Sequence, residues 1–484
     1  MNTPAGTSTT SRRTTLFVSA LATLASILAL PAAGQLTSDP YPDAIPQSEG
    51  VIRVAYVEFA EVPDFEGRPP RMMHLAGEPG SDRMFVNDMW GVLYRISSGG
   101  ETVTEYLDLT DSDWGFSVDA RSGERGFQSF AFHPQFREAG TPGYGKFYTY
   151  VDVVDTSPEG DFTAPSNQVT HHTLLLEWTA GNPDADAYDG EGPREVMRFA
   201  QPFANHNAGQ LGFNPLASPG DADFGLLYMG VADGGSGGDP LDLSQDLGLA
   251  FGKIFRIDPL GSTGANGEYG IPSDNPFAGD GDPTTLGEIY AYGVRNPQRF
   301  GWDPDNGNLF MSDIGQNTIE ELSIVTRGAN LGWNDWEGSY RFIGREGVDG
   351  GDYRTDPSVT YPVAEYGHTD PLLVEGDAAA SGVHVYRDDA IPQLEGLVLF
   401  GDNPSGEILY IDADNLPEGG EEGVRRILLN DDGQAKTLLQ LVREKTQAQG
   451  REPAENVDLR IGTGPDGRVF LLNKFDGTIR MLVP

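Results

Sequence analysis

The chain has 484 residues, with 73 acidic against 32 basic side chains, a formal charge of −41 and no cysteine. Because phosphate backbones and anionic lipids are bound by basic faces, this charge argues against a nucleic-acid partner and against docking on an anionic membrane. Without cysteine, neither disulfides nor thiolate metal sites can form. An acidic coat of this size is typical of a well-solvated protein, and the alternative is charge clustered to hold divalent cations.

The N-terminal segment has the three regions of an export signal in their usual order. Arg12 and Arg13 precede an apolar run over 16–30, and small residues follow over 31–34. We expect a signal peptide over residues 1–34, a linker over 35–50 and the folded domain over 51–484. The sequence thus predicts a periplasmic or secreted protein with no stable membrane insertion after cleavage; an uncleaved anchor is the alternative.

Short β-rich runs bounded by Gly, Asp, Asn and Pro recur after residue 50, and we read the chain as all-β. One pattern repeats: an apolar stretch, a Pro or polar turn, an apolar strand, a loop and a further strand. Since one small antiparallel sheet cannot bury both its faces, several such sheets packed around an axis would bury them together. We therefore predict a six-bladed β-propeller. The six copies of the pattern lie at residues 83–96, 130–178, 210–258, 299–325, 382–411 and 458–482.

His206 is the first candidate for chemistry. It lies in the segment 205–211, Asn-His-Asn-Ala-Gly-Gln-Leu, just before a strand of the third copy. In a propeller, the innermost strand meets the central axis at that point. A histidine with an ordinary pKa near ~6.5 can act as a general base there. The alternative is a structural histidine in a loop.

Two further segments have the composition of a ligand site. Arg295 and Asn296 stand between Gly293 and Pro297, and their donors and acceptors suit a planar, anionic, oxygen-rich ligand. Pairing of the arginine with an acidic loop is the alternative. The turn 312–317 contains a glycine among polar residues, so it could aim carbonyl oxygens at calcium.

Several blocks of sequence, in this order, resemble the glucose/sorbosone dehydrogenase family: 124–134, 205–211, 293–299, 313–322 and 330–334. The segment 400–406 is similar to the branch of Hedgehog-interacting-protein-like propellers. The resemblance implies a six-bladed propeller that binds pyrroloquinoline quinone (PQQ) and calcium and oxidises the C1 hydroxyl of an aldose to a lactone, with a soluble electron acceptor as a further partner. It also implies the site residues: His206 as the base, Arg295 and Asn296 as cofactor contacts, Glu124 and Asn205 as polar residues lining the site, and Gly315 and Gln316 as carbonyl ligands of calcium.

The sequence also departs from the family at two cationic positions. Pro404 and Ser405 stand where family members have a lysine, and Glu455 and Val457 stand where they have a pair of arginines. Because PQQ carries three carboxylates, each lost charge-assisted contact would cost about 1.5–3 kcal/mol; Arg460 is a possible substitute for one of them. Two other functions therefore stay open: an extracellular propeller without cofactor that binds carbohydrate or protein, and a calcium-dependent lactonase-like hydrolase.

Overall fold

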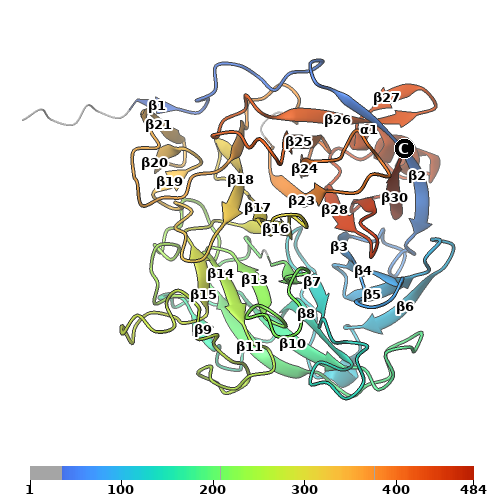
Figure 1. Cartoon of the computed structure of the whole chain (residues 1–484), viewed down its shortest axis with the longest axis vertical. Coiled ribbons are helices and arrows are strands. Elements are labelled where there is room, and N and C mark those ends of the chain that lie inside the picture. The colour runs from blue at the N-terminus through green and yellow to red at the C-terminus, as the bar shows by residue number, and fades with distance from the viewer. Residues whose placement is uncertain (1–34, 208, 375–376) are drawn as a thin grey trace, which may run out of the picture.

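The computed structural model describes residues 35–207, 209–374 and 377–484. The expected signal peptide, residues 1–34, lies outside these ranges. Within them the chain is nearly all-β, with 30 strands, one α-helix and one 3₁₀ turn, η1 (Ser112–Trp114). Figure 1 shows the sheets arranged around a common centre. No described helix has the length and apolar character needed to cross a membrane.

Most strands belong to antiparallel runs of four that follow the chain order. The first run is β3 (Met72–Gly77), β4 (Met84–Asp88), β5 (Val92–Ile96) and β6 (Val103–Asp108). The second is β7 (Phe127–Phe132), β8 (Lys146–Val153), β10 (His171–Thr179) and β11 (Arg194–Gln201), with β9 (Phe162–Thr163) at its edge. The third is β12 (Leu211–Phe213), β13 (Leu227–Val231), β14 (Lys253–Ile257) and β15 (Ile289–Tyr292).

The remaining runs complete the circle. The fourth is β16 (Pro297–Trp302), β17 (Leu309–Asp313), β18 (Ile319–Val325) and β22 (Ala364–Gly367). The fifth is β23 (Ala380–Tyr386), β24 (Leu397–Asp402), β25 (Ile408–Asp412) and β26 (Arg425–Asp431), with β27 (Gln434–Lys436) attached to β26. The last is β28 (Arg460–Thr463), β29 (Val469–Leu472) and β30 (Thr478–Val483), to which the N-terminal strand β2 (Ile52–Glu61) is added.

The first strand of each run faces the centre. Contacts join β3 to β7, β7 to β12, β16 to both β13 and β23, β23 to β28, and β28 back to β3. In an antiparallel run the start of the first strand and the end of the second lie at the same edge. The loops that lead into the first strands therefore gather at one end of the central region, together with the loops that follow the second strands. We call this end the axial face.

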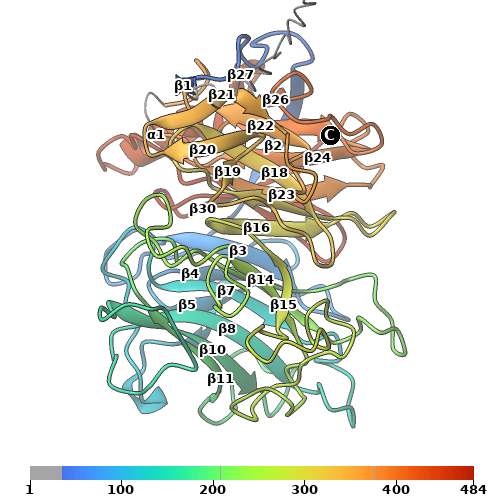
Figure 2. The same cartoon turned by 90° about the vertical axis from the view of Figure 1, so that its left-hand side faces the viewer.

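Strand β2 closes the circle between the two ends of the chain. It pairs antiparallel with β30, with Val57 opposite Met481, and parallel with β26, with Ile52 opposite Ile427. In Figure 2 the blue N-terminal strand lies among the C-terminal strands. The sequence pattern counted the last copy from its own three strands and did not include this one.

The core consists of apolar side chains packed between neighbouring runs. Phe85 of the first run and Phe130 of the second are fully buried in one cluster, and Tyr150 and Phe255 join the second run to the third in another. Burying a side chain of this size contributes about 1.5–3 kcal/mol. This packing fixes the loops of the axial face relative to one another.

Residues 35–50, expected as a linker, pack onto the domain. Strand β1 (Leu36–Thr37) pairs with β21 (Gly347–Tyr353), which continues into β20 (Tyr340–Gly344) and β19 (Trp336–Glu337). Ile45 is buried, and its N–H donates to Asp370 Oδ2 at 2.7 Å. The one α-helix, α1 (Leu438–Ala448), begins at a capping box formed by Thr437 and Gln440 and buries its leucines against the last two runs.

Candidate functional site

His206 lies on the axial face, in the loop before β12. Its backbone N–H donates to Glu124 Oε2 at 2.6 Å, and its Nδ1 lies 2.6 Å from Asp233 Oδ1. The side chain of His206 is only 6% exposed, and its backbone has a φ of 58°, a left-handed conformation that is uncommon outside glycine. Such conformations persist where the surroundings enforce them, and they cluster at functional sites.

Asp233, which follows β13, fixes the imidazole. Its carboxylate accepts from Gly235 N at 2.9 Å and from Trp333 Nε1 at 3.0 Å in addition to His206. Since an ionised carboxylate only accepts, His206 Nδ1 must carry the proton. His206 Nε2 is then an acceptor, and it makes no hydrogen bond with the residues that the structure describes. The arrangement is that of a general base held in one tautomer by a buried carboxylate.

Arg295 and Asn296 lead into β16 on the same face. Their backbone N–H groups donate to the two oxygens of Asp313, at 2.9 and 2.6 Å. Burial raises the pKa of Asp313 to about 7, although these two hydrogen bonds act in the opposite direction. The Arg295 carbonyl accepts from Asp233 N at 2.8 Å, so the loop that bears the arginine is joined directly to the partner of His206.

The turn after β17 holds Gly315 and Gln316. Glu337 Oε1 accepts the N–H groups of four consecutive residues, 316–319, at 2.8–3.1 Å. A Cβ on Gly315 would lie 1.6 Å from the carbonyl oxygen of Ile319, so only glycine fits. Within the described ranges, no donor reaches the carbonyl oxygens of Gly315 and Gln316. Free carbonyls beside a rigid turn are the kind of ligand that calcium takes.

The side chain of Gln316 ties this turn to the rest of the site. Its Oε1 accepts from Gly238 N at 2.6 Å and lies 3.4 Å from Arg295 Nη2. Asn205 Oδ1 accepts from Ser236 N at 2.9 Å, in the same glycine-rich loop that begins at Asp233. Six of the seven residues singled out in the sequence are thereby joined through hydrogen bonds on one face, and Gly315 stands next to Gln316 in the chain. Their roles stay predictions.

Sequence reasoning did not find the partners that hold these residues. Asp233 is 27 positions from His206, and Trp333 is 100 positions from Asp233. Glu337 belongs to the small sheet of β19–β21, which the repeat pattern did not contain. The only signal was an aspartate, Asp233, shortly after a strand and directly before a run of glycines.

The two positions that depart from the family are occupied by structural contacts. Ser405 Oγ donates to Asp402 Oδ2 at 2.5 Å. Val457 is fully buried, and its N–H donates to the carbonyl of Pro404 at 3.0 Å. Neither position offers a positive charge to a ligand.

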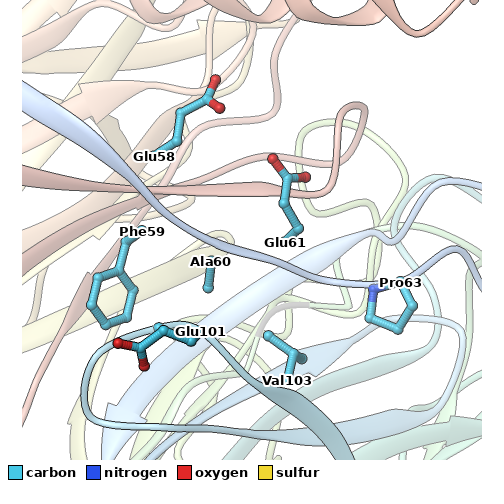
Figure 3. A pocket seen from close by; sticks show the side chains of 8 residues that line it. Glu58, Phe59, Ala60, Glu61, Pro63, Glu101 and Val103 are labelled. Carbon is cyan, nitrogen blue, oxygen red and sulfur yellow. The ribbon is translucent and has the colours of Figure 1, made fainter.

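Two cavities are lined by none of these site residues. One of about 370 Å³ lies beside β2 and is lined in part by Glu58, Glu61 and Glu101. Figure 3 shows Glu58 and Glu61 rising from β2, with Glu101 on the loop opposite. Both strand carboxylates bind Lys445 Nζ at 2.8 Å. The other cavity, of about 670 Å³, is lined in part by Trp90. Among the described residues, no three His, Asp or Glu side chains are grouped to hold a metal ion.

The model of the Glucose / Sorbosone dehydrogenase family matches residues 70–479. The chain belongs to the glucose/sorbosone dehydrogenase family. This family member is 31% identical over 367 residues to the HIPL2 protein of Arabidopsis thaliana, covering 68% of the chain and 50% of that protein. It is 27% identical over 327 residues to the Hedgehog-interacting protein of Mus musculus, covering 67% of this chain and 39% of that protein. It is 24% identical over 317 residues to quinoprotein glucose dehydrogenase B of Acinetobacter calcoaceticus, covering 61% of this chain and 58% of that protein.

The chain thus spans about half the length of the curated relatives it matches. Among solved structures, the PQQ-bound form of the aldose sugar dehydrogenase from Streptomyces coelicolor aligns with a TM-score of 0.53 at 20% identity, covering 94% of this chain and 99% of that one. At this identity the likeness shows the fold alone. The predicted resemblance, to the family and to its Hedgehog-interacting-protein-like members, is confirmed.

Proposed function

We propose that this protein is a quinoprotein-type oxidoreductase that oxidises the C1 hydroxyl of an aldose to a lactone, with PQQ and calcium. The observation that carries the proposal is the 2.6 Å contact between His206 Nδ1 and buried Asp233, which leaves Nε2 as a base. The names of two relatives, a quinoprotein glucose dehydrogenase and a PQQ-bound aldose sugar dehydrogenase, support it.

In this proposal His206 is the catalytic residue. Its Nε2 takes the proton of the C1 hydroxyl while the hydride leaves C1, so that the alcohol loses two electrons and becomes the lactone. Bound PQQ would supply the two-electron acceptor for that hydride. Asp233 is a positioning residue: it keeps the proton on Nδ1 and stabilises the imidazolium that forms.

The other axial residues would bind cofactor and metal. Arg295 and Asn296 would offer hydrogen-bond donors to the cofactor, and the Nε of Arg295 is buried without a partner among the described residues. Gly315 and Gln316 would give their carbonyl oxygens to calcium. Glu124 and Asn205 border His206 and would contact the sugar.

The wider assignment follows from the same proposal. The six antiparallel runs would be the blades of a six-bladed propeller over residues 51–484. Residues 1–34 would be the signal peptide of a periplasmic or secreted enzyme, whose partners are a sugar and a soluble electron acceptor.

A second candidate function is an extracellular propeller without cofactor that binds carbohydrate or protein. It is favoured by the uncharged or acidic residues at the two cationic positions of the family and by the likeness to the Hedgehog-interacting protein. The two candidates differ in whether the protein reduces a dye when aldose, PQQ and calcium are supplied.

The test is dye reduction by the purified protein with a panel of aldoses, with His206→Asn beside the wild type. Asparagine tolerates the left-handed backbone at this position, so the variant removes the base and keeps the loop. His133→Asn is the matched control, because it removes a buried imidazole that follows the end of β7, away from the axial face. We expect turnover in the wild type and the control and none in His206→Asn. Full turnover in His206→Asn would remove this residue from its role, and no turnover in the wild type would favour the second function.

A further inference from the structure

Four cations gather where the first strands meet, which is unusual in a chain of charge −41. Arg71 precedes β3, Arg299 lies on β16, Arg460 begins β28, and Lys474 lies in the loop between β29 and β30. Arg299, Arg460 and Lys474 are 2%, 3% and 8% exposed. We call these four residues the central cation cluster.

Direct contacts bring the cluster together from three different runs. Arg460 Nη1 lies 2.7 Å from Asp458 Oδ1, and Lys474 Nζ binds the other oxygen of the same carboxylate. Arg299 Nη2 reaches across the centre and donates to the carbonyl of Met73 at 2.7 Å, two residues beyond Arg71. The pKa of Lys474 is lowered to about 7, mainly by burial; Asp458 acts in the opposite direction, and Arg460 and Arg71 act in the same direction as burial.

The cluster has more positive than negative charge. Asp458 is the one carboxylate that binds any of the four side chains among the described residues. Arg299 donates only to the carbonyls of Gln298 and Met73, and Arg71 only to those of the loop 120–123. Asp88 lies near Arg71, but its carboxylate accepts backbone N–H groups. The Nε atoms of Arg299 and Arg460 are buried with no partner in the described part of the chain.

Buried cations without counter-charges are costly, so an anion that enters this region is bound favourably. The cluster opens on the axial face, since the Asp458 side chain is 19% exposed and Arg71 is half-buried. Lys474 Nζ lies 3.4 Å from the carbonyl of Gly123. The next residue, Glu124, binds the backbone of His206. The mouth of the cluster is therefore adjacent to the candidate catalytic site.

We infer that the central cation cluster binds the carboxylate groups of a multiply charged anion, with Lys474 and Arg71 as its contacts at the mouth. This inference rests on the proposed function in one respect: the anion would be the quinone cofactor, a tricarboxylate. The charges that family members place at the positions of Ser405 and Val457 would then come from different loops around the same centre.

Binding measurements test the inference without reference to turnover. PQQ is titrated in the presence of calcium and followed by quenching of tryptophan fluorescence. Benzene-1,3,5-tricarboxylate, a planar tricarboxylate, is titrated separately by calorimetry without calcium. The variants are Lys474→Met and Arg71→Met. Lys445→Met is the control, because it makes the same change of charge on a lysine that pairs with Glu58 and Glu61 at the outer edge.

We expect the two cluster variants to bind both ligands about tenfold or more weakly, and the control to bind as the wild type does. If Lys474→Met fails to fold, Lys474→Gln takes its place. PQQ binding that is unchanged in both variants would overturn the inference and leave the proposed function standing. Binding of the benzene tricarboxylate that depends on Lys474, without any PQQ binding, would overturn the proposed function and support the inference. No binding of either ligand would overturn both.

Discussion

Replacing Asp233 by asparagine perturbs the contact on which the proposed chemistry depends. The carboxylate accepts three hydrogen bonds, two on Oδ1 from His206 and Gly235 and one on Oδ2 from Trp333. A carboxamide has only one acceptor oxygen. If that oxygen keeps the hydrogen bonds from His206 and Gly235, the amide NH₂ group faces the indole N–H of Trp333, and two donors oppose each other. If the amide turns over, the N–H₂ faces Nδ1, and His206 must move its proton to Nε2.

The magnitude follows from these bonds. An unpaired buried indole N–H costs about 1–3 kcal/mol, and the loss of charge assistance on the other two bonds adds about 1 kcal/mol each, so we expect Asp233→Asn to lower the free energy of unfolding by about 3–5 kcal/mol. A base in the wrong tautomer should lower turnover by about 10²- to 10⁴-fold.

Thermal unfolding and dye reduction measure the two effects, and Trp333→Phe supplies a matched double variant. Phenylalanine removes the N–H that opposes the amide, so Asp233→Asn should cost less stability in the Trp333→Phe background than in the wild type. Equal costs in the two backgrounds would refute the assignment of the indole contact. Turnover of Asp233→Asn at the wild-type rate would refute the positioning role.

Two further predictions concern the calcium turn and the pH dependence of stability. Gly315→Ala puts a Cβ 1.6 Å from the carbonyl oxygen of Ile319, so it should abolish the rise in melting temperature that calcium produces. Gly279→Ala is the control, because its Cβ would stand in open space, and it should keep the calcium response. A calcium response retained in Gly315→Ala would exclude this turn as the metal site. Burial raises the pKa of Glu421 from its ordinary 4.5 to about 8. Between pH 4.5 and pH 8 the folded protein therefore keeps a proton that the unfolded chain has lost. The stabilisation from this group is complete below about pH 4.5 and disappears as the pH rises to about 8. Glu421→Gln, which can still accept from Gly367 N, should therefore show a smaller fall in melting temperature over this range than the wild type, and identical slopes would contradict the assignment.

The sequence predicted the repeat, and it singled out residues that the structure places on one face, but it did not predict the residues that hold them. His206, Arg295 and Gly315 could be found because each stands next to a strand end, and all first strands of such repeats start at the same face. Asp233 could not be paired with His206, because nothing in a spacing of 27 residues indicates a contact.

Apart from Arg460, the cations of the central cluster were missed for a different physical reason. The family resemblance directed attention to Ser405 and Val457, but the centre of a radial fold can be reached by a long side chain from any loop around it. Arg71 and Lys474 reach it from the first and last runs. The N-terminal strand β2 was missed for a similar reason, because its partners Met481 and Ile427 lie at the far end of the chain.

The most direct test of His206 as the base is a single turnover without any added electron acceptor. Protein loaded with PQQ and calcium is mixed anaerobically with an excess of aldose, and the absorbance of the quinone is followed. We expect reduction of one quinone per site in the wild type and none in His206→Asn, with the same amount of quinone bound in both. Reduction at the same rate in the two proteins, or no quinone bound by the wild type, would contradict it.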